Sequence, residues 1–161
     1  MNTNEVKIIN FDKKYAKDLS VIITRNLIEI NTKDYSMEEM IELSKDFTPE
    51  EIIEYSENRK IFIALINEKP IGTLDIAKTI VKKKFHYHFL NIFVLPEFHK
   101  KGIGTKLIEY GEKYVMKKKG KKITILSSKT AHKFYQKRGY NYKNNLMQTD
   151  HNGLYEMIKY L

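Results

Sequence analysis

A short basic loop with two glycines, residues 99–104, is the part of this sequence best suited to hold a ligand. It reads His-Lys-Lys-Gly-Ile-Gly, follows an apolar stretch that ends at Pro96, and opens a helical pattern near Gly102. The first N–H groups of a helix have no partner within it, and with the helix dipole they form an anion site. Glycines let the backbone approach such a ligand closely. The loop therefore predicts a site for a phosphorylated ligand.

Two well-known phosphate loops do not fit this spacing. A P-loop requires Gly-x-x-x-x-Gly-Lys-Ser/Thr, whereas the chain has Gly102-Ile-Gly-Thr-Lys. A dinucleotide fingerprint requires a third glycine within a parallel βαβ unit, whereas position 107 is Leu and the preceding strands suggest a meander. A glycine pair at a helix start is also compatible with close packing alone.

The elements that must position this loop are readable from hydrophobic periodicity. Thr48-Pro49-Glu50-Glu51 has the N-cap, first-turn proline and third-position Glu of a capping box. The resulting order specifies a mixed-sheet α/β fold, expected as a single domain over residues 1–161. The expected strands are 7–11, 60–66, 71–81, 85–94, 123–126, 140–147 and 154–160. One expected helix ends at about residue 30, and the other four cover about 36–43, 49–58, 102–119 and 130–137.

Composition excludes several classes of protein. The 161 residues include no Cys, which excludes a disulfide scaffold, a thiolate metal site and a cysteine nucleophile. No run of about 18 apolar residues occurs, so no membrane span or membrane partner is expected. The start, residues 1–7, lacks the apolar core of a signal peptide. A cytoplasmic protein is expected.

The formal charge of +9 comes mainly from lysine, because only three of the 29 basic residues are arginines. Nucleic-acid-binding proteins tend to cluster Arg with aromatic residues in a groove-reading element, and no such cluster occurs, so no nucleic-acid partner is expected. The charge is uneven, since residues 31–58 hold nine acids against two lysines.

At this point the chain resembles the GNAT superfamily of N-acetyltransferases. Members use an Arg/Gln-x-x-Gly-x-Gly/Ala loop after the fourth strand to hold the pyrophosphate of acetyl-CoA, and residues 99–104 match it with His99 as the departure. Residues 131–140, with Phe134-Tyr135 and Gly139-Tyr140, match a closing A-x-x-F/L-Y-x-x-x-G-F/Y string. The element order fits along nearly the whole chain. The resemblance implies a mixed, mostly antiparallel central sheet flanked by helices.

The resemblance also implies roles for residues around the loop. The backbone of the strand end would pair with the pantetheine arm, the loop amides would hold the pyrophosphate with His99 capping it, and Ser128 would bond the cofactor near its thiol. Tyr135 matches the tyrosine that donates to the departing thiolate, although an aromatic packed under the helix is the alternative. The cofactor-binding residues implied are Ile92, Phe93, Val94, His99, Lys100, Lys101, Gly102, Ile103, Gly104, Thr105 and Ser128.

The reaction implied is direct attack of an amine on the thioester, with the oxyanion met by a backbone N–H, that of Val94. An alkyl amine of pKa about 10 is mostly protonated near pH 7, a handicap of about 4 kcal/mol, so a base or a relayed water is expected. The position where relatives often carry Glu is Leu90. His88 could serve as base, or simply decorate the strand, and Asn91 could orient a water.

The leading hypothesis is therefore an acetyl-CoA-dependent N-acetyltransferase, with acetyl-CoA as co-substrate and no metal. The acceptor is a primary amine on a small molecule or a peptide. The acidic region 31–58 would favour a cationic amine if it walls the acceptor site, although acids along helix faces are usually just solvated. Tyr35 is a further acceptor-side candidate. Three alternatives stay open: another acyl-CoA as donor, a non-catalytic acyl-CoA sensor, and a basic nucleic-acid-binding domain. Family members often form homodimers, and nothing in the sequence fixes the oligomeric state.

Overall fold

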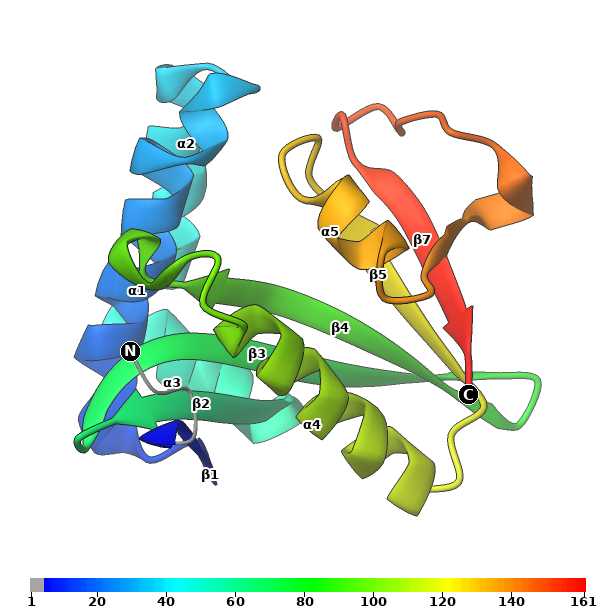
Figure 1. The fold of residues 1–161 in the computed structure, drawn as a ribbon, viewed down its shortest axis with the longest axis horizontal. Helices are drawn as coiled ribbons and strands as arrows, with labels where there is room; N and C mark the ends of the chain where they lie inside the picture. The colour runs from blue at the N-terminus through cyan, green and yellow to red at the C-terminus, as the bar shows by residue number, and fades with distance from the viewer. Residues whose placement is uncertain (1–4) are drawn as a thin grey trace.

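A seven-stranded sheet with helices on both faces organises residues 5–161, which the computed structural model describes (Figure 1). The strand order is β1-β2-β3-β4-β5-β7-β6, and within this range β4 and β5 form the one parallel pair. The expected mixed, mostly antiparallel sheet is thus confirmed. The strands are β1 (Lys7–Asn10), β2 (Lys60–Ile66), β3 (Lys69–Val81), β4 (Lys84–Val94), β5 (Lys122–Ser127), β6 (Asn141–Tyr142) and β7 (Tyr155–Tyr160), and the helices are α1 (Ala16–Glu29), α2 (Met37–Ser44), α3 (Pro49–Asn58), α4 (Ile103–Lys117) and α5 (His132–Gln136).

Two apolar clusters hold the helices against opposite faces of the sheet. On one face, α1, α2 and α3 contribute residues such as Leu27, Met40 and Ile52, which pack on alternate residues of β2. On the other face, α4 buries Ile103, Leu107, Ile108 and Val115 along one stripe. The alternation of strand side chains and the helical spacing on α4 produce this division.

β4 bends at a bulge and then separates from β5. Thr73 faces Phe93 across the ladder and Asp75 faces Leu90, so β4 has one extra residue there, and Asn91 has φ +49°. β5 pairs with β4 only over the three residues that end at Phe89. Beyond that point the two strands diverge (Figure 1), which leaves the last part of β4 open on one side.

One local prediction is wrong and another is half correct. The strand expected over 140–147 shrinks to β6, because Asn144 and Asn145 have φ +55° and +57° and end the extended backbone. The helix-start prediction at Thr48 is half correct. Its Oγ accepts from the N–H of Glu51 at 3.2 Å, but the complete reciprocal capping box lies at the start of α2, at Ser36.

No helix within residues 5–161 is long and apolar enough to cross a membrane. The prediction that the chain start is not a signal peptide rests on residues 1–7, of which 1–4 lie outside the described residues.

Candidate active site

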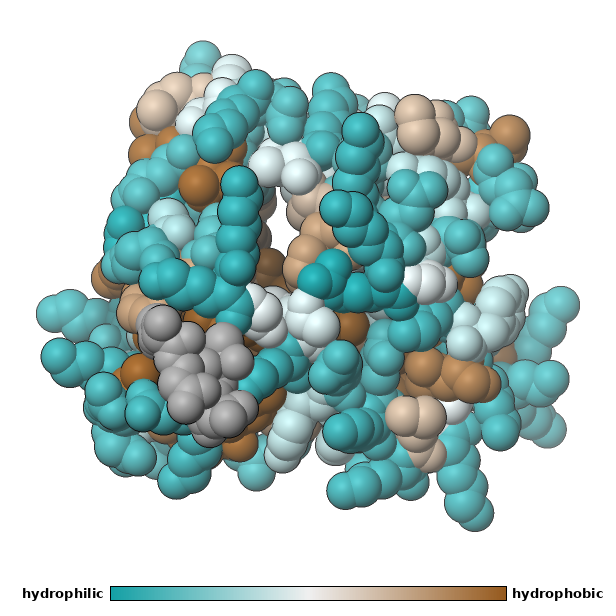
Figure 2. Space-filling view, viewed as in Figure 1, coloured by the Kyte–Doolittle hydropathy of each residue, from teal (hydrophilic) through white to brown (hydrophobic). Residues whose placement is uncertain are grey.

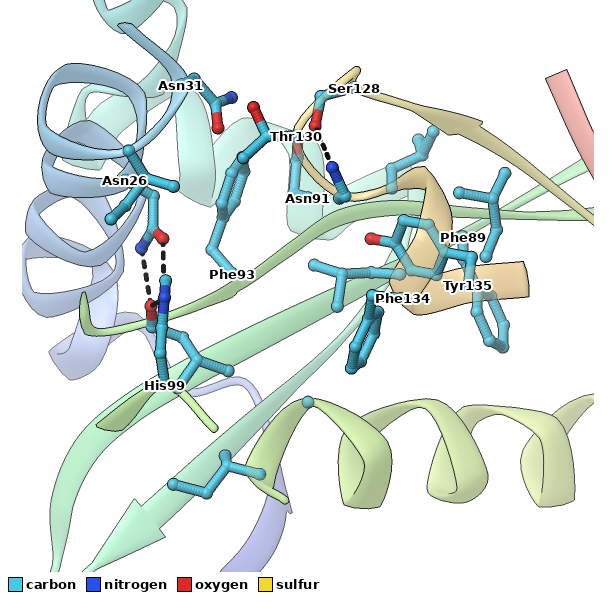
Figure 3. Close-up of a pocket in the computed structure, with 18 of the residues that line it drawn as sticks. Asn26, Asn31, Phe89, Asn91, Phe93, His99, Ser128, Thr130, Phe134 and Tyr135 are labelled. Carbon is cyan, nitrogen blue, oxygen red and sulfur yellow. Dashed lines mark hydrogen bonds between the residues drawn. The ribbon is translucent and has the colours of Figure 1, made fainter. Parts of the chain in front are cut away.

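A cleft of about 840 Å³ lies where β4 and β5 diverge. Its walls come from α1, the end of β4, the loop before α4, the end of β5 and α5. Figure 2 shows an opening between the α2 side and the α5 side, with brown apolar atoms visible inside it. Figure 3 shows how polar side chains from these segments, including Asn31, Asn91, Ser128 and Thr130, gather around the same space. The bulge and splay of β4 therefore create the site.

One end of the cleft is the N-terminus of α4, which has no side-chain cap. Gly102 is the N-cap residue, with φ +78°, and a Cβ built there would meet nothing within 4 Å. Glycine is favoured here by backbone conformation, and the empty space beside it is open to the cleft. The amides of Ile103, Gly104 and Thr105 are the donors that a helix start leaves without an internal partner. This end fits a diphosphate.

Four basic side chains line the same cleft, and one of them contacts the start of α4. Lys100, Lys133, Lys137 and Arg138 all line the cleft. The guanidinium of Arg138 lies 3.5 Å from the centre of the Phe134 ring, and its Nε donates to Thr105 Oγ1 at 2.9 Å. Sequence analysis missed three of these four cations, although they occupy the variable positions of the second motif. They raise the positive potential where phosphate groups would lie.

The end of β4 is tied to α1 by a histidine and an asparagine. His99 Nε2 is 2.7 Å from the carbonyl of Val94 and 3.2 Å from Asn26 Oδ1, and both are acceptors, so Nε2 donates (Figure 3). Asn26 Nδ2 donates to the same carbonyl at 2.8 Å. His99 lines the cleft, but its Nε2 proton is engaged by the backbone. The amides at the start of α4 therefore remain the donors at that end of the cleft, which we call the phosphate end.

These ties also orient the Val94 peptide group. Leu95 N donates to Ile71 O on β3 at 2.8 Å, whereas the Val94 carbonyl turns away from β3 toward Asn26. Since the N–H and C=O of one residue in an extended strand point to the same side, the Val94 N–H also points away from β3. β5 does not pair with this part of β4. The Val94 N–H is thereby directed into the cleft.

Tyr135 lies on α5 with only 6% of its surface exposed, and its hydroxyl points into the cleft (Figure 3). Among the described residues its hydroxyl has no hydrogen-bond partner. Burial raises the pKa of Tyr135 far above its usual value, and nearby Arg138 only partly offsets this. The phenol is therefore held protonated and can act as a hydrogen-bond donor.

A buried carboxylate that sequence analysis missed lies behind the cleft. Asp75 is 3% exposed, and Asn91 Nδ2, from the bulge, donates to its Oδ2 at 2.8 Å. Burial raises the pKa of Asp75 to about 7, although Asn91 and the Arg59 guanidinium 3.6 Å away lower it in part. The signal in the sequence was an acid among the apolar residues of a strand. Asn91 also lines the cleft.

The structure brings most of the expected site residues together and leaves two apart. His88 and Lys101 do not line the cleft. The His88 ring is 3.0 Å from Thr79 Oγ1 on β3, and burial lowers its pKa. Ser128 lines the cleft and accepts from the N–H of Ala131 at 3.2 Å. The expected residues that line the cleft are Asn91, Ile92, Phe93, Val94, His99, Lys100, Gly102, Ile103, Gly104, Thr105, Ser128 and Tyr135.

The expectation of an acidic acceptor wall is wrong. None of the nine acids in residues 31–58 lines the cleft, and that region contributes Asn31, Leu43 and Phe47 instead. The physical reason is the amphipathic pattern of α2 and α3, whose apolar faces turn inward and whose acids face water. Within residues 5–161 no group of three or more His, Asp or Glu side chains is placed to hold a metal ion.

Comparison with known proteins decides the family. Residues 24–140 match the model of the acetyltransferase (GNAT) family. The chain belongs to this GNAT family. A comparison with curated proteins found no match.

Solved structures share the GNAT fold over nearly the whole chain. PaiA N-acetyltransferase from Thermoplasma acidophilum, in complex with coenzyme A, is 18% identical with a TM-score of 0.83, and the match covers 97% of this chain and 99% of that one. A GCN5-related N-acetyltransferase from Rhodopseudomonas palustris is 20% identical with a TM-score of 0.83, covering 100% and 99%. An acetyltransferase from Clostridium acetobutylicum, with acetyl-CoA, is 20% identical with a TM-score of 0.67, covering 90% and 96%.

Proposed function

We propose that this GNAT protein is an acetyl-CoA-dependent N-acetyltransferase that acts on a primary amine. The observation that carries the proposal is one cleft with three kinds of donor along it. These are the uncapped amides of α4, the inward-pointing N–H of Val94 and the protonated hydroxyl of Tyr135. Their order suits a long ligand with phosphates at one end and a thioester at the other.

In this proposal the backbone does most of the binding. The amides of residues 103–105, with Arg138 and Lys100 beside them, would hold the pyrophosphate of acetyl-CoA. The open edge of β4, at Ile92 and Val94, would pair with the amide groups of the pantetheine arm, whereas the backbone of Phe93 faces β3. Ser128 keeps its hydroxyl proton as a donor, since its oxygen accepts from Ala131.

The neutral amine would attack the thioester carbon of acetyl-CoA directly, so that a C–N bond forms and the C–S bond breaks. The proton that the nitrogen then loses would balance the thiolate, which leaves as CoA with a free thiol. The Val94 N–H would stabilise the negative charge that develops on the carbonyl oxygen. Tyr135 would donate a hydrogen bond to the departing sulfur. Complete proton transfer is unfavourable, because phenol is a weaker acid than thiol by about 1.5 pKa units even without burial. Burial of Tyr135 strengthens that difference, so its role is hydrogen bonding rather than proton donation.

The acceptor must lose a proton before it attacks. Apolar walls disfavour the ammonium form and lower the pKa of a bound amine. Asn91 donates its amide protons toward Asp75, which leaves its Oδ1 to accept from an amine N–H. Asn91 is therefore proposed to orient the amine rather than deprotonate it.

The test is calorimetric titration of the full chain with acetyl-CoA, followed by a screen of amines for release of free thiol. Micromolar binding and amine-dependent thiol release are expected. Binding without release for any amine would favour an acyl-CoA sensor. Faster transfer from a longer acyl-CoA would identify another donor. An absence of binding at millimolar acetyl-CoA would overturn the proposal.

A further inference from the structure

Several apolar side chains that line the cleft come from segments other than α4 and the loop before it. Six such side chains, from four segments, mark the part of the cleft that we call the acceptor chamber. The only polar side chains beside them belong to neutral residues such as Asn31, Asn91 and Thr130. The six apolar residues are Leu27, Ile30, Leu43, Phe47, Phe93 and Leu126.

No acid of the described chain lines the cleft. The two carboxylates that form hydrogen bonds with lining residues do not themselves line the cleft. Asp34 Oδ2 accepts from Thr130 Oγ1 at 2.8 Å, and Asp75 lies buried behind Asn91 with Arg59 on its other side. Of the cations that line the cleft, Arg138 lies at the start of α4, where it donates to Thr105 Oγ1. A second positive charge on an acceptor would thus be desolvated against chamber walls that carry no carboxylate.

The chamber is also closed along one edge by contacts between distant parts of the chain. Tyr35 donates its hydroxyl proton to the carbonyl of Gly153 at 2.8 Å and accepts from the N–H of Lys129 at 3.0 Å. Together with the bond from Thr130 to Asp34, these contacts join the segment after α1 to the loops around α5 and before β7. We call this bridge the roof. The opening that remains in Figure 2 has a hydrophilic rim and apolar atoms in its depth.

The structure assigns the acceptor chamber a substrate class. We propose that it takes a small primary amine that carries one charge and an apolar body, in preference to a polyamine or a lysine on a folded protein. The apolar body is buried against Phe47 and Phe93, and the amine reaches the side of the cleft where Asn91 lies. The roof excludes a protein surface. This inference rests on the proposed N-acetyltransferase function.

The test compares two amines of equal size, hexylamine and 1,5-diaminopentane, which differ by replacement of a methyl group with a second amine. We expect kcat/KM, followed by thiol release at saturating acetyl-CoA, to be at least about tenfold higher for hexylamine. Equal values, or a preference for the diamine, would overturn the assignment.

A pair of variants on one helix isolates the chamber. Leu43→Glu places an acid on the wall of the chamber. Ile41→Glu makes the same charge change at a similarly exposed position of α2 that does not line the cleft. We expect Leu43→Glu to shift the ratio of the two kcat/KM values toward the diamine by about tenfold, and Ile41→Glu to leave it unchanged. An equal shift in both variants would contradict the role of the chamber.

Binding separates this assignment from the proposed function. Calorimetry of the CoA-loaded protein with each amine measures the preference without turnover. Tighter binding of hexylamine without thiol release would support the chamber and overturn the transferase. Thiol release with the reverse preference would support the transferase and overturn the chamber. No binding and no turnover of hexylamine would overturn the chamber.

Discussion

The two ends of the cleft differ in what forms them, since one consists of backbone groups and the other of side chains. At the phosphate end, one continuous segment, residues 99–105, supplies backbone donors at the start of a helix. At the acceptor end, side chains from α1, α2, β4 and β5 meet only because the chain folds. The first end is therefore defined by backbone geometry and tolerates many side chains. The second end is defined by side chains, and its specificity can change without a change of fold.

The largest expected effect falls on the phosphate end. Gly102→Glu should weaken acetyl-CoA binding by about 1000-fold, because it places a negative charge beside the phosphates and a side chain at φ +78°. Calorimetry provides the measurement. Gly102→Ala isolates the backbone strain and should cost only about fivefold. If the two variants bound equally well, the charge argument would fail.

The next largest effect is expected at Tyr135. Tyr135→Phe should lower kcat by about 100-fold and leave the Kd for acetyl-CoA and the stability nearly unchanged, because the hydroxyl has no partner among the described residues. Steady-state kinetics and thermal unfolding check this. The matched control is Tyr140→Phe, whose hydroxyl donates to Glu112 at 3.0 Å outside the cleft. That variant should lose about 1 kcal/mol of stability and keep its kcat.

A third prediction concerns Asp75, which lies buried behind Asn91. The pKa of Asp75 is about 7 in the folded protein against 3.8 as its ordinary value. The folded state therefore binds the Asp75 proton more tightly than the unfolded state does. The resulting contribution of Asp75 to the free energy of unfolding is complete below about pH 4 and is lost as the pH rises through about 7. Asp75→Asn should remove this loss and gain about 2 kcal/mol relative to the wild type between pH 5.5 and 8.

Thermal unfolding at both pH values measures this difference. Arg59 remains beside the new amide, and 27% of its side chain is exposed, so water can solvate its charge. Arg59→Gln is the complementary variant and should steepen the loss of stability with pH, because it removes the cation that lowers the pKa of Asp75. Parallel pH profiles for wild type and Asp75→Asn would refute the assignment of the raised pKa.

The smallest expected effect lies at the roof. Tyr35→Phe removes the bond to Gly153 and the acceptor for Lys129, and it should raise KM for hexylamine about threefold with kcat nearly unchanged. Kinetics at saturating acetyl-CoA measure the change. An effect on acetyl-CoA affinity of the same size would show that the roof serves the other end of the cleft.

The sequence predicted the glycine loop and the helix that starts after it, because their signal is local. A glycine-rich turn, a helix start and a strand before it are adjacent in the chain, and the element order placed them in the correct fold. Arg138 was missed because its packing on Phe134 and its bond to Thr105 join two segments. Asp75 was missed because the contact with Asn91 depends on a bulge that periodicity does not show.

The prediction of acidic residues around the acceptor was wrong for a related reason. The acids between 31 and 58 are dense in the sequence, but helical periodicity turns them outward and leaves Leu43 and Phe47 facing the cleft. A count of charges in a segment says little about the surface it presents to a site. The prediction of His88 as a possible base met the same limit, because its position on the strand directs its ring toward Thr79.

The central claim is that this cleft transfers acetyl from acetyl-CoA to an amine. The most direct test incubates the full chain with acetyl-CoA and hexylamine and quantifies N-hexylacetamide by mass spectrometry and free CoA by its thiol. The account predicts equal amounts of the two products and none of either without the amine. Thiol release that does not need the amine, or bound acetyl-CoA with no acetamide, would contradict it.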